Sequence, residues 1–333
     1  MNRSVWSVGP LLALAIGCGG PGDEALELEG TPLDPTRETT AEAADEPSPP
    51  APAAVAPGDV VGAAALPLYG LTELGELREP ELWDALAQAR AVCLGETHDN
   101  PAHHFAQLRA VRELATRAQA SGLSFAVGFE MFQTPFQSVL SGFAAGELDE
   151  RELLAGSEYG ARWGYDFALY RPLLELVRML ELQALALNAP VELTERIGDV
   201  GLDGLTPPER ASLPELDLDD PEYRAYVYEL FGASHAAGFG GVDLENPYAV
   251  QVVWDETMAQ SSSDWLVAGG DAARLAVIAG LGHCHRSAIP SRITRRTGLP
   301  VLAVAPILAS RIGAPGFPSL EHYDLLLVLD DQR

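Results

Sequence analysis

The chain has 333 residues, of which 48 are acidic and 21 basic, so its formal net charge is −27. Every basic residue is Arg. Nucleic acids are bound through clustered positive charge, so this balance argues against a nucleic-acid partner. The hydrophobic fraction of 47% is ordinary for a globular protein and allows a sizeable core.

The first 18 residues have the features of an export signal. Arg3 precedes an apolar run over residues 5–16, which is too short to span a bilayer. The run ends in Ala15-Ile16-Gly17-Cys18, which resembles a bacterial lipobox. We therefore expect a signal peptide over residues 1–18, a lipid on Cys18 and a domain held at the cell envelope by that anchor. Gly19 after the lipidated Cys is compatible with delivery to the outer membrane of a Gram-negative cell. The alternative to lipidation is an unprocessed anchor or a Cys that occurs there by chance.

Residues 19–63 are rich in Pro, Ala, Glu and Thr and hold almost no large apolar side chains. Such a segment cannot bury enough apolar surface to offset the entropy lost on ordering. We expect a disordered tether here and one folded domain over residues 64–333.

From residue 91 onward, short apolar runs alternate with stretches of helical periodicity. This pattern predicts an α/β fold with a mainly parallel sheet that is covered by helices on both faces. Residues 191–247 form an insertion larger than an ordinary crossover, and we expect a helical lid or subdomain there. The expected strands are residues 91–94, 125–129, 184–187, 275–279, 301–305 and 325–329, and the expected helices are residues 102–120, 167–182, 223–234 and 248–261.

Polar residues follow four of these strands. Ligands bind at the carboxyl ends of the strands in open parallel sheets, so these residues are expected to meet in one crevice. Gly95-x-x-His98 and Gly280-x-x-His283 repeat one Gly-x-x-His pattern, which allows an ancient internal duplication. A Gly at a strand end lets the chain turn sharply. The polar residues at the four strand ends are Glu96 with His98, Glu130, Asn188 and His283.

Two imidazoles and two carboxylates at such a crevice fit either a divalent transition metal or acid–base catalysis. The plain structural alternative is that one His caps a helix and one Glu pairs with an Arg. His103, His104 and His285 are weaker candidates, because the first two begin an amphipathic helix and His285 can face away.

Aromatic residues form two further groups. An aromatic stripe on a helix usually belongs to the core. Polar Gln251 and Asp255 share one stripe here, which favours a wall for a flat apolar ligand with a polar edge. The two groups are Trp163, Tyr165 and Tyr170, and Gln251, Trp254, Asp255 and Met258.

Beyond residue 18 the chain has two cysteines, Cys93 and Cys284. They would form a disulfide in an oxidising compartment if their strands are neighbours, which the sequence leaves open. Cys284 beside His283 and His285 also allows a thiol nucleophile.

At these residues the chain resembles the ChaN family. The resemblance rests on order and spacing across residues 70–305, whereas the Cys284-His285 pair and the tail over residues 309–333 depart from it. The matching segments are Leu94-Gly-Glu-Thr-His-Asp-Asn-Pro-Ala-His-His104, Gly128-Phe-Glu-Met-Phe132, Leu187-Asn-Ala-Pro190, Gln251-x-x-Trp-Asp-x-x-Met-Ala259 and Ala279-Gly-Leu-Gly-His283.

The resemblance implies a haem-binding lipoprotein of the cell envelope with a role in iron uptake. Haem would lie in the crevice, or between the protomers of a homodimer, and would need an axial ligand. Tyr165, Tyr170, His104 and Met258 are the candidate ligands.

The resemblance also reaches Tiki proteases and erythromycin-esterase-like enzymes. It therefore implies, as the alternative, a metal-dependent hydrolase. In that case His98, His283 and Glu130 would bind Fe, Mn, Co or Zn, and Glu96 or His98 would activate water.

Overall fold

The computed structural model describes residues 66–235 and 244–332. The expected signal peptide, the tether and Cys18 lie outside the described residues, as do residues 236–243 of the expected insertion. Within the described part of the chain, no helix combines the length and the apolar character needed to cross a membrane.

The described residues form one eight-stranded sheet in the order β2-β1-β8-β7-β3-β6-β4-β5. The strands from β8 to β5 run parallel, whereas β1 pairs antiparallel with β8 and with β2 at one edge. This confirms the expected α/β class with a mainly parallel sheet. The strands are β1 (Leu68–Thr72), β2 (Gly75–Leu77), β3 (Ala91–Glu96), β4 (Ser124–Gln133), β5 (Gln183–Asn188), β6 (Ala273–Gly280), β7 (Val301–Leu308) and β8 (Leu325–Leu329).

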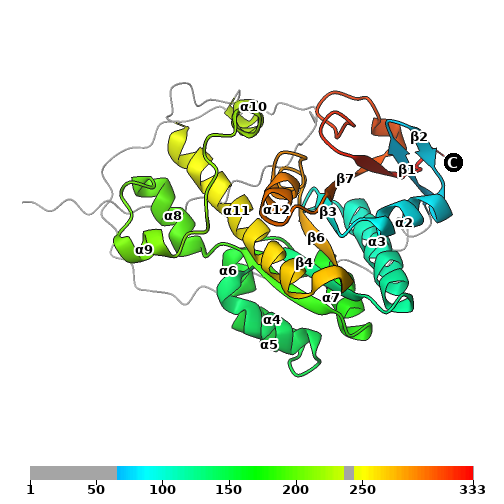
Figure 1. Ribbon diagram of the computed structural model, residues 1–333, viewed down its shortest axis with the longest axis horizontal. Helices are drawn as coiled ribbons and strands as arrows, with labels where there is room; N and C mark the ends of the chain where they lie inside the picture. Colours follow the sequence, from blue (N-terminus) through cyan, green and yellow to red (C-terminus); the bar gives the residue numbers. More distant parts are fainter. Residues whose placement is uncertain (1–65, 236–243, 333) are drawn as a thin grey trace, which may run out of the picture.

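Helices cover both faces of the sheet (Figure 1). α2, α3 and α7 pack on one face, and α11 and α12 pack on the other. The helices are α2 (Glu79–Gln88), α3 (Pro101–Ala120), α4 (Gln137–Ala144), α5 (Glu150–Gly156), α6 (Tyr159–Arg162), α7 (Phe167–Met179), α8 (Val191–Val200), α9 (Pro207–Ala211), α10 (Pro221–His235), α11 (Glu245–Ala268) and α12 (Ile289–Thr297).

The alternation of side chains along β3 explains why its sequence is continuously apolar. Val92 and Leu94 enter the core beneath α2, α3 and α7, whereas Ala91 and Cys93 enter the core beneath α11 and α12. Successive side chains of a strand point to opposite faces, so a strand covered on both faces needs apolar residues at every position.

The connections of the sheet diverge between β3 and β6, which are neighbours. The chain leaves β3 through α3 toward β4 on one side, and it leaves β6 through α12 toward β7 on the other. Such a switch point leaves a crevice outside the carboxyl ends of the two strands. His98 follows β3 and His283 follows β6, so both reach this crevice.

All six expected strands are present, but several extend further than expected. β4 continues through Gln133, so Glu130 lies within the strand and not after it. The pairing of β4 with β5 shifts register between Phe129 and Gln133. Such an irregularity re-aims side chains near the end of a strand, which explains how Glu130 faces the crevice.

The expected helix over residues 102–120 is α3, and it begins at Pro101. The side chain of Asn100 caps it by accepting hydrogen bonds from the backbone N–H groups of Ala102 and His103. This cap keeps the connection from β3 short and holds His98 close to the strand end. The expected insertion contains α8, α9 and α10. The elements that were not expected are β1, β2, α2, α4, α5, α6 and α12.

Candidate functional site

A crevice of about 140 Å³ lies at the carboxyl ends of β3, β4, β5 and β6. It is lined by aromatic, imidazole and carboxylate groups from segments far apart in the sequence. The lining residues are His98, Glu130, Gln133, Arg162, Trp163, Tyr165, Asn188, Ala189, Val191, Thr194, Gln251, Trp254, Gly280, Gly282 and His283.

Glu96 and His98 form the first of two imidazole–carboxylate groups. The Nδ1 atom of His98 lies 2.9 Å from Oε1 of Glu96, and the hydroxyl of Tyr170 donates to the same oxygen at 2.7 Å. The other carboxylate oxygen lies 3.4 Å from Nδ1 of His104. Glu96 is therefore a buried anion that holds the ring of His98 from behind.

Opposing effects set the protonation of this group. Burial raises the pKa of Glu96, but the charges and hydrogen bonds of His104, His98 and Tyr170 outweigh it and lower that pKa to about 2. Burial lowers the pKa of His98, whereas its hydrogen bond to Glu96 and the charge of Glu130 raise it, with a net rise. The pair thus favours a carboxylate beside an imidazolium.

His283 forms the second group and contacts carboxylates through both ring nitrogens. Its Nδ1 lies 2.5 Å from Oδ1 of Asp255, and its Nε2 lies 3.2 Å from Oε1 of Glu130. Burial lowers the pKa of His283, but the charges of Glu130 and Asp255 raise it well above the ordinary value. Glu130 also accepts a hydrogen bond from the backbone N–H of Gly280 at 2.7 Å.

Asp255 is fully buried and is held in place by α10. The hydroxyl of Tyr223 donates a short hydrogen bond to its Oδ2 atom. The guanidinium of Arg292 lies over the ring of Tyr223, 3.8 Å from its centre. Burial raises the pKa of Tyr223 well above its ordinary value, so the phenol stays protonated and serves as a donor.

Both glycines of the repeated Gly-x-x-His pattern sit at close approaches. A Cβ at Gly280 would lie 3.0 Å from Cε1 and 3.1 Å from Nε2 of His98. A Cβ at Gly95 would lie 2.9 Å from a methyl group of Leu281. The pattern therefore lets each strand end pack against the residues that follow the other strand.

Aromatic rings form the outer wall of the crevice. The rings of Trp163 and Tyr165 each lie 4.8 Å from the ring of His98, and Trp254 lies 6.2 Å from His283. Burial, followed by the charge of Asp99, raises the pKa of Tyr165. Arg162 stands at the rim, where it donates to Gln133 at 2.9 Å and to Glu192 at 2.7 Å.

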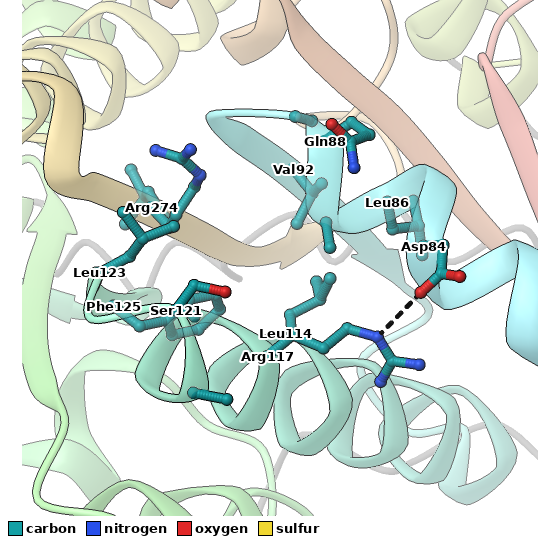
Figure 2. A pocket seen from close by; sticks show the side chains of 15 residues that line it. Asp84, Leu86, Gln88, Val92, Leu114, Arg117, Ser121, Leu123, Phe125 and Arg274 are labelled. Carbon is teal, nitrogen blue, oxygen red and sulfur yellow. Dashed lines mark hydrogen bonds and ion pairs between the residues drawn. The ribbon is translucent and has the colours of Figure 1, made fainter.

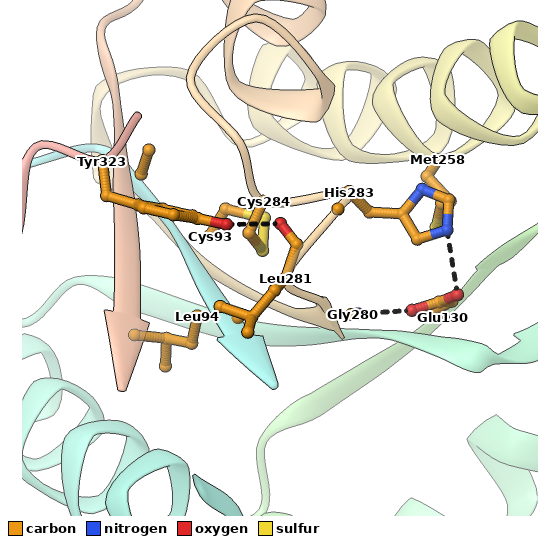
Figure 3. The surroundings of a disulfide bond; sticks show 12 residues. Cys93, Leu94, Glu130, Met258, Gly280, Leu281, His283, Cys284 and Tyr323 are labelled. Atoms are coloured by element: carbon orange, nitrogen blue, oxygen red, sulfur yellow. Dashed lines mark hydrogen bonds and ion pairs between the residues drawn. A yellow bond between two sulfur atoms is a disulfide. The ribbon is translucent and has the colours of Figure 1, made fainter. Parts of the chain in front are cut away.

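A disulfide joins Cys93 in β3 to Cys284, directly after His283 (Figure 3). Both cysteines are fully buried, and their Cα atoms lie 5.3 Å apart. The bond resolves the pairing that the sequence left open. It also overturns the suggestion of a nucleophilic thiol at Cys284, because the sulfur carries no free thiol.

The structure brings Glu96, His98, Glu130 and His283 together as expected, but it separates the expected pocket residues into two sets. The first set lines the crevice and consists of Trp163, Tyr165, Asn188, Gln251 and Trp254. The second set lies behind the crevice and consists of His104, Tyr170, Asp255 and Met258.

Each residue of the second set is held away from the crevice by a specific contact. The Nε2 atom of His104 lies 2.9 Å from the backbone oxygen of His98, and the hydroxyl of Tyr170 donates a hydrogen bond to Glu96. Asp255 bonds His283, and Met258 is fully buried in the core beneath α11. These four residues were expected on the pocket wall, but they lie behind it.

Among residues 66–235 and 244–332, no three His, Cys, Asp or Glu side chains are grouped so as to hold a metal ion. The imidazoles and carboxylates at the crevice contact one another instead. The metal site expected from His98, His283 and Glu130 is thus not supported by this geometry.

A different cavity, of about 420 Å³, lies at the opposite end of the sheet (Figure 2). It opens beside the starts of β3, β4 and β6, between α2 and α3. Apolar side chains such as Leu114 and Phe125 form its floor, and Arg117 pairs with Asp84 at its edge. It lacks the imidazoles and buried carboxylates of the crevice at the carboxyl ends.

Several residues at the site escaped the sequence analysis. Tyr223 donates a hydrogen bond to Asp255, and Gln133 accepts one from Arg162. Tyr223 contacts Asp255 through the packing of α10 on α11, which no local pattern reveals. Gly280 was expected as part of the repeated strand-end motif, and its close approach to His98 is the new observation.

The family model described as haem-binding uptake, Tiki superfamily, ChaN matches residues 82–293, more than half of the chain. The chain belongs to this family. The match includes every residue of the two imidazole–carboxylate groups. No match was found among curated protein sequences.

One of the similar solved structures, with a TM-score above 0.5, shows the same fold. ChaN of Campylobacter jejuni, described as binding haem cofacially, is 18% identical over 79% of this chain and 97% of that chain, with a TM-score of 0.59. The type III effector HopBA1 is 14% identical over 75% of this chain and 92% of that chain, with a TM-score of 0.42. A mutant of the erythromycin esterase EreC in its open conformation is 14% identical over 74% of this chain and 77% of that chain, with a TM-score of 0.40.

Proposed function

We propose that this chain binds haem at the crevice between β3 and β6 and serves iron uptake at the cell envelope. Membership of the haem-binding ChaN family supports the ligand. The single observation that carries the proposal is the aromatic wall of Trp163, Tyr165 and Trp254, which includes a phenolic oxygen, that of Tyr165, able to bind iron. Aromatic walls with few polar groups are the usual surroundings of a flat cofactor.

In this proposal Tyr165 would bind the haem iron through its phenolic oxygen. Of the four candidates from the sequence, it alone lines the crevice, whereas Tyr170, His104 and Met258 are buried behind it. A tyrosinate is an established haem-iron ligand, and a bound ferric ion would offset the raised pKa of the phenol. His98 lies against the Tyr165 ring and would fix its orientation.

The size of the crevice decides how haem would bind. At about 140 Å³ it is smaller than the roughly 300–1,000 Å³ of pockets that enclose an organic ligand. It therefore fits one face or edge of a macrocycle, and the rest would remain uncovered. Burying the exposed face against a second haem-loaded protomer would make a homodimer, and the cofacial haem of ChaN from C. jejuni supports this arrangement. Arg162 at the rim would receive a propionate.

The envelope location rests on two observations. The first 18 residues have the features of a lipoprotein signal peptide that ends at Cys18. The disulfide between Cys93 and Cys284 is of a kind that persists in oxidising compartments. We propose a lipid anchor on Cys18 with the domain outside the cytoplasm.

An optical titration of the purified full chain with haemin tests the proposal. We expect a saturable shift of the Soret band that is lost in Tyr165→Phe. Tyr170→Phe is the matched control, because it removes a phenol that lies behind the crevice, and it is expected to keep the band. A titration without a saturable shift would overturn haem binding, and a shift that Tyr165→Phe leaves unchanged would overturn the role of Tyr165.

A hydrolase is the second candidate function. The observation that favours it is the pair of carboxylate-held imidazoles, His98 and His283, on one small crevice. In the metal-dependent form, His98, His283 and Glu130 would have to give up their present contacts to hold a divalent ion, which would supply an activated water. Elemental analysis of the purified chain and a screen of ester and peptide substrates test it. Cleavage that requires a specific metal in the unaltered chain, and that is lost in His98→Ala, would favour the hydrolase over haem binding.

A further inference from the structure

A second cavity, of about 480 Å³, lies at the same end of the sheet on the other side of the segment from Leu281 to His283. It is bounded by the ends of β3 and β7, by α10 and by the connection between β7 and β8. Its volume lies within the range of pockets that enclose small organic ligands. Haem bound at the crevice would leave this cavity free.

Aromatic rings with fixed orientations line this cavity. The ring of Tyr226 stacks on that of His285, with centres 3.7 Å apart and planes 17° apart. His322 lies 4.9 Å from His285, and Tyr323 lies 6.1 Å from it. The hydroxyl of Tyr226 donates to the backbone oxygen of Gly282 at 3.3 Å, so the stack is anchored to the polypeptide. Such rings offer flat surfaces to a planar ligand.

His285 contributes a hydrogen-bond donor of defined tautomer. The backbone N–H of Ser287 donates to its Nδ1 atom at 3.1 Å, and the hydroxyl of Ser287 lies 2.8 Å from the same atom. Because the backbone N–H can only donate, Nδ1 is the acceptor, and the neutral ring carries its proton on Nε2. The residue is 4% exposed, and its Nε2 atom is buried with no hydrogen-bond partner among the described residues. A buried N–H without an acceptor is rare in folded proteins and indicates a missing partner.

His103, in the first turn of α3, also lines the cavity and repeats this arrangement. The backbone N–H of Thr97 donates to its Nδ1 atom at 3.0 Å, so Nε2 again carries the proton. Burial is the main cause that lowers the pKa of His103 to about 4 and that of His285 to about 3, so both rings are neutral at neutral pH. The lining of the cavity therefore contains two neutral N–H groups, and that of His285 is covered by its neighbours in this structure.

This tautomer discriminates between classes of ligand. A metal ion would need the lone pair of Nε2, which requires the proton on Nδ1, but Nδ1 accepts a backbone hydrogen bond in both residues. An organic cation such as an ammonium group carries only donors itself, so it cannot accept a hydrogen bond from these Nε2–H groups. The donors instead match an oxygen acceptor, and the stacked rings match a flat hydrophobic body.

We propose that this second cavity binds a small planar aromatic molecule that carries a carbonyl oxygen, with the oxygen accepting the Nε2–H of His285. The ring system lies among Tyr226, Phe317 and Tyr323. The site is separate from the proposed haem site, because Glu130, Tyr165 and the other side chains of the crevice do not line it and the two cavities share only the backbone at Gly282.

The test uses three naphthalene probes with the purified full chain, followed by probe fluorescence. 2-Acetylnaphthalene supplies a neutral carbonyl, 2-naphthoate supplies a carboxylate, and naphthalene supplies neither. We expect saturable binding of at least one oxygen-bearing probe, about 2- to 10-fold tighter than that of naphthalene, as one hydrogen bond provides. The tighter of the two oxygen-bearing probes identifies whether the natural ligand is neutral or anionic.

His285→Phe is the matched variant, because it keeps a ring to stack on Tyr226 and removes the donor. We expect it to bind all three probes equally. The melting temperature and the haemin titration of the same variant check that it is folded, and haem binding is expected to be unchanged. Absence of saturable probe binding in the unaltered chain, or a preference for oxygen that persists in folded His285→Phe, overturns the proposal.

Discussion

The Nδ1 atom of His283 lies 2.5 Å from Oδ1 of Asp255, while its Nε2 atom lies 3.2 Å from Oε1 of Glu130. Both nitrogens of the ring are thus engaged by carboxylates. This arrangement favours an imidazolium that neutralises two buried anions. His283 is therefore better suited to holding the floor of the crevice together than to acting as a free base.

Replacing Asp255 with Asn tests this relationship. Asp255→Asn removes one of the two negative charges, so we expect the pKa of His283 to fall toward its ordinary value. Breaking a buried ionic contact typically costs about 3–5 kcal/mol, so unfolding should also become easier. NMR titration of the histidine rings measures the first effect, and urea unfolding measures the second. Tyr223→Phe is the control, because it retains the Asp255 charge, and an unchanged His283 titration in Asp255→Asn would contradict the assignment.

The stability of the chain is expected to fall steeply on the acid side of neutrality. Burial lowers the pKa of His103 to about 4 and that of His285 to about 3, below the ordinary 6.5. In the unfolded chain these rings take up protons near pH 6.5, so the stability that they contribute is complete above that pH. It is lost as the pH falls from 6.5 toward 4 and 3, at about 1–2 kcal/mol per pH unit for each ring.

Urea unfolding measured between pH 7 and pH 4 gives this slope. His285→Phe removes one of the two groups, so its stability should depend less steeply on pH over the same interval. His322→Phe serves as the comparison, because it removes a half-buried neighbouring histidine and keeps His285. Equal slopes for His285→Phe and the unaltered chain would show that His285 is not held neutral.

The parallel strands were predictable because burial on both faces leaves a continuous apolar run, as in β3 and β8. The hairpin of β1 and β2 gave no such signal, since Gly75 and Glu76 are exposed and the strand is three residues long. Short, half-exposed strands depend on their neighbours for stability and have little pattern of their own.

The same contrast holds at the site. The Gly-x-x-His repeats predicted where His98 and His283 meet, because a strand end and a following turn are local features. Tyr165 and Tyr170 lie five residues apart in one aromatic segment, and only packing places the first on the crevice wall and the second behind Glu96. Which side chain faces a cavity is a tertiary property that spacing does not encode.

Gly280→Ala is expected to disturb the crevice, whereas Gly282→Ala is expected to be tolerated. A Cβ at position 280 would lie 3.0 Å from the ring of His98, closer than ordinary contacts. At position 282 the nearest atoms are the hydroxyl of Tyr226 at 3.5 Å and a methyl group of Leu230 at 3.6 Å. Crowding a packed position costs about 1–3 kcal/mol. We expect weaker haemin binding and a displaced His98 resonance in Gly280→Ala only, and similar effects in both variants would refute the close-approach role.

The disulfide between Cys93 and Cys284 closes a loop of the chain with a sequence separation of 191 residues, next to His283. Cross-linking such distant residues restricts the unfolded chain, so the double variant Cys93→Ala, Cys284→Ala should lose about 2–5 kcal/mol of stability. Unfolding in guanidinium measures the loss. With a phosphine reductant present, the unaltered chain should approach the double variant, because both then lack the cross-link. A double variant as stable as the oxidised chain would show that β3 and β6 hold the His283 segment without help from the bond.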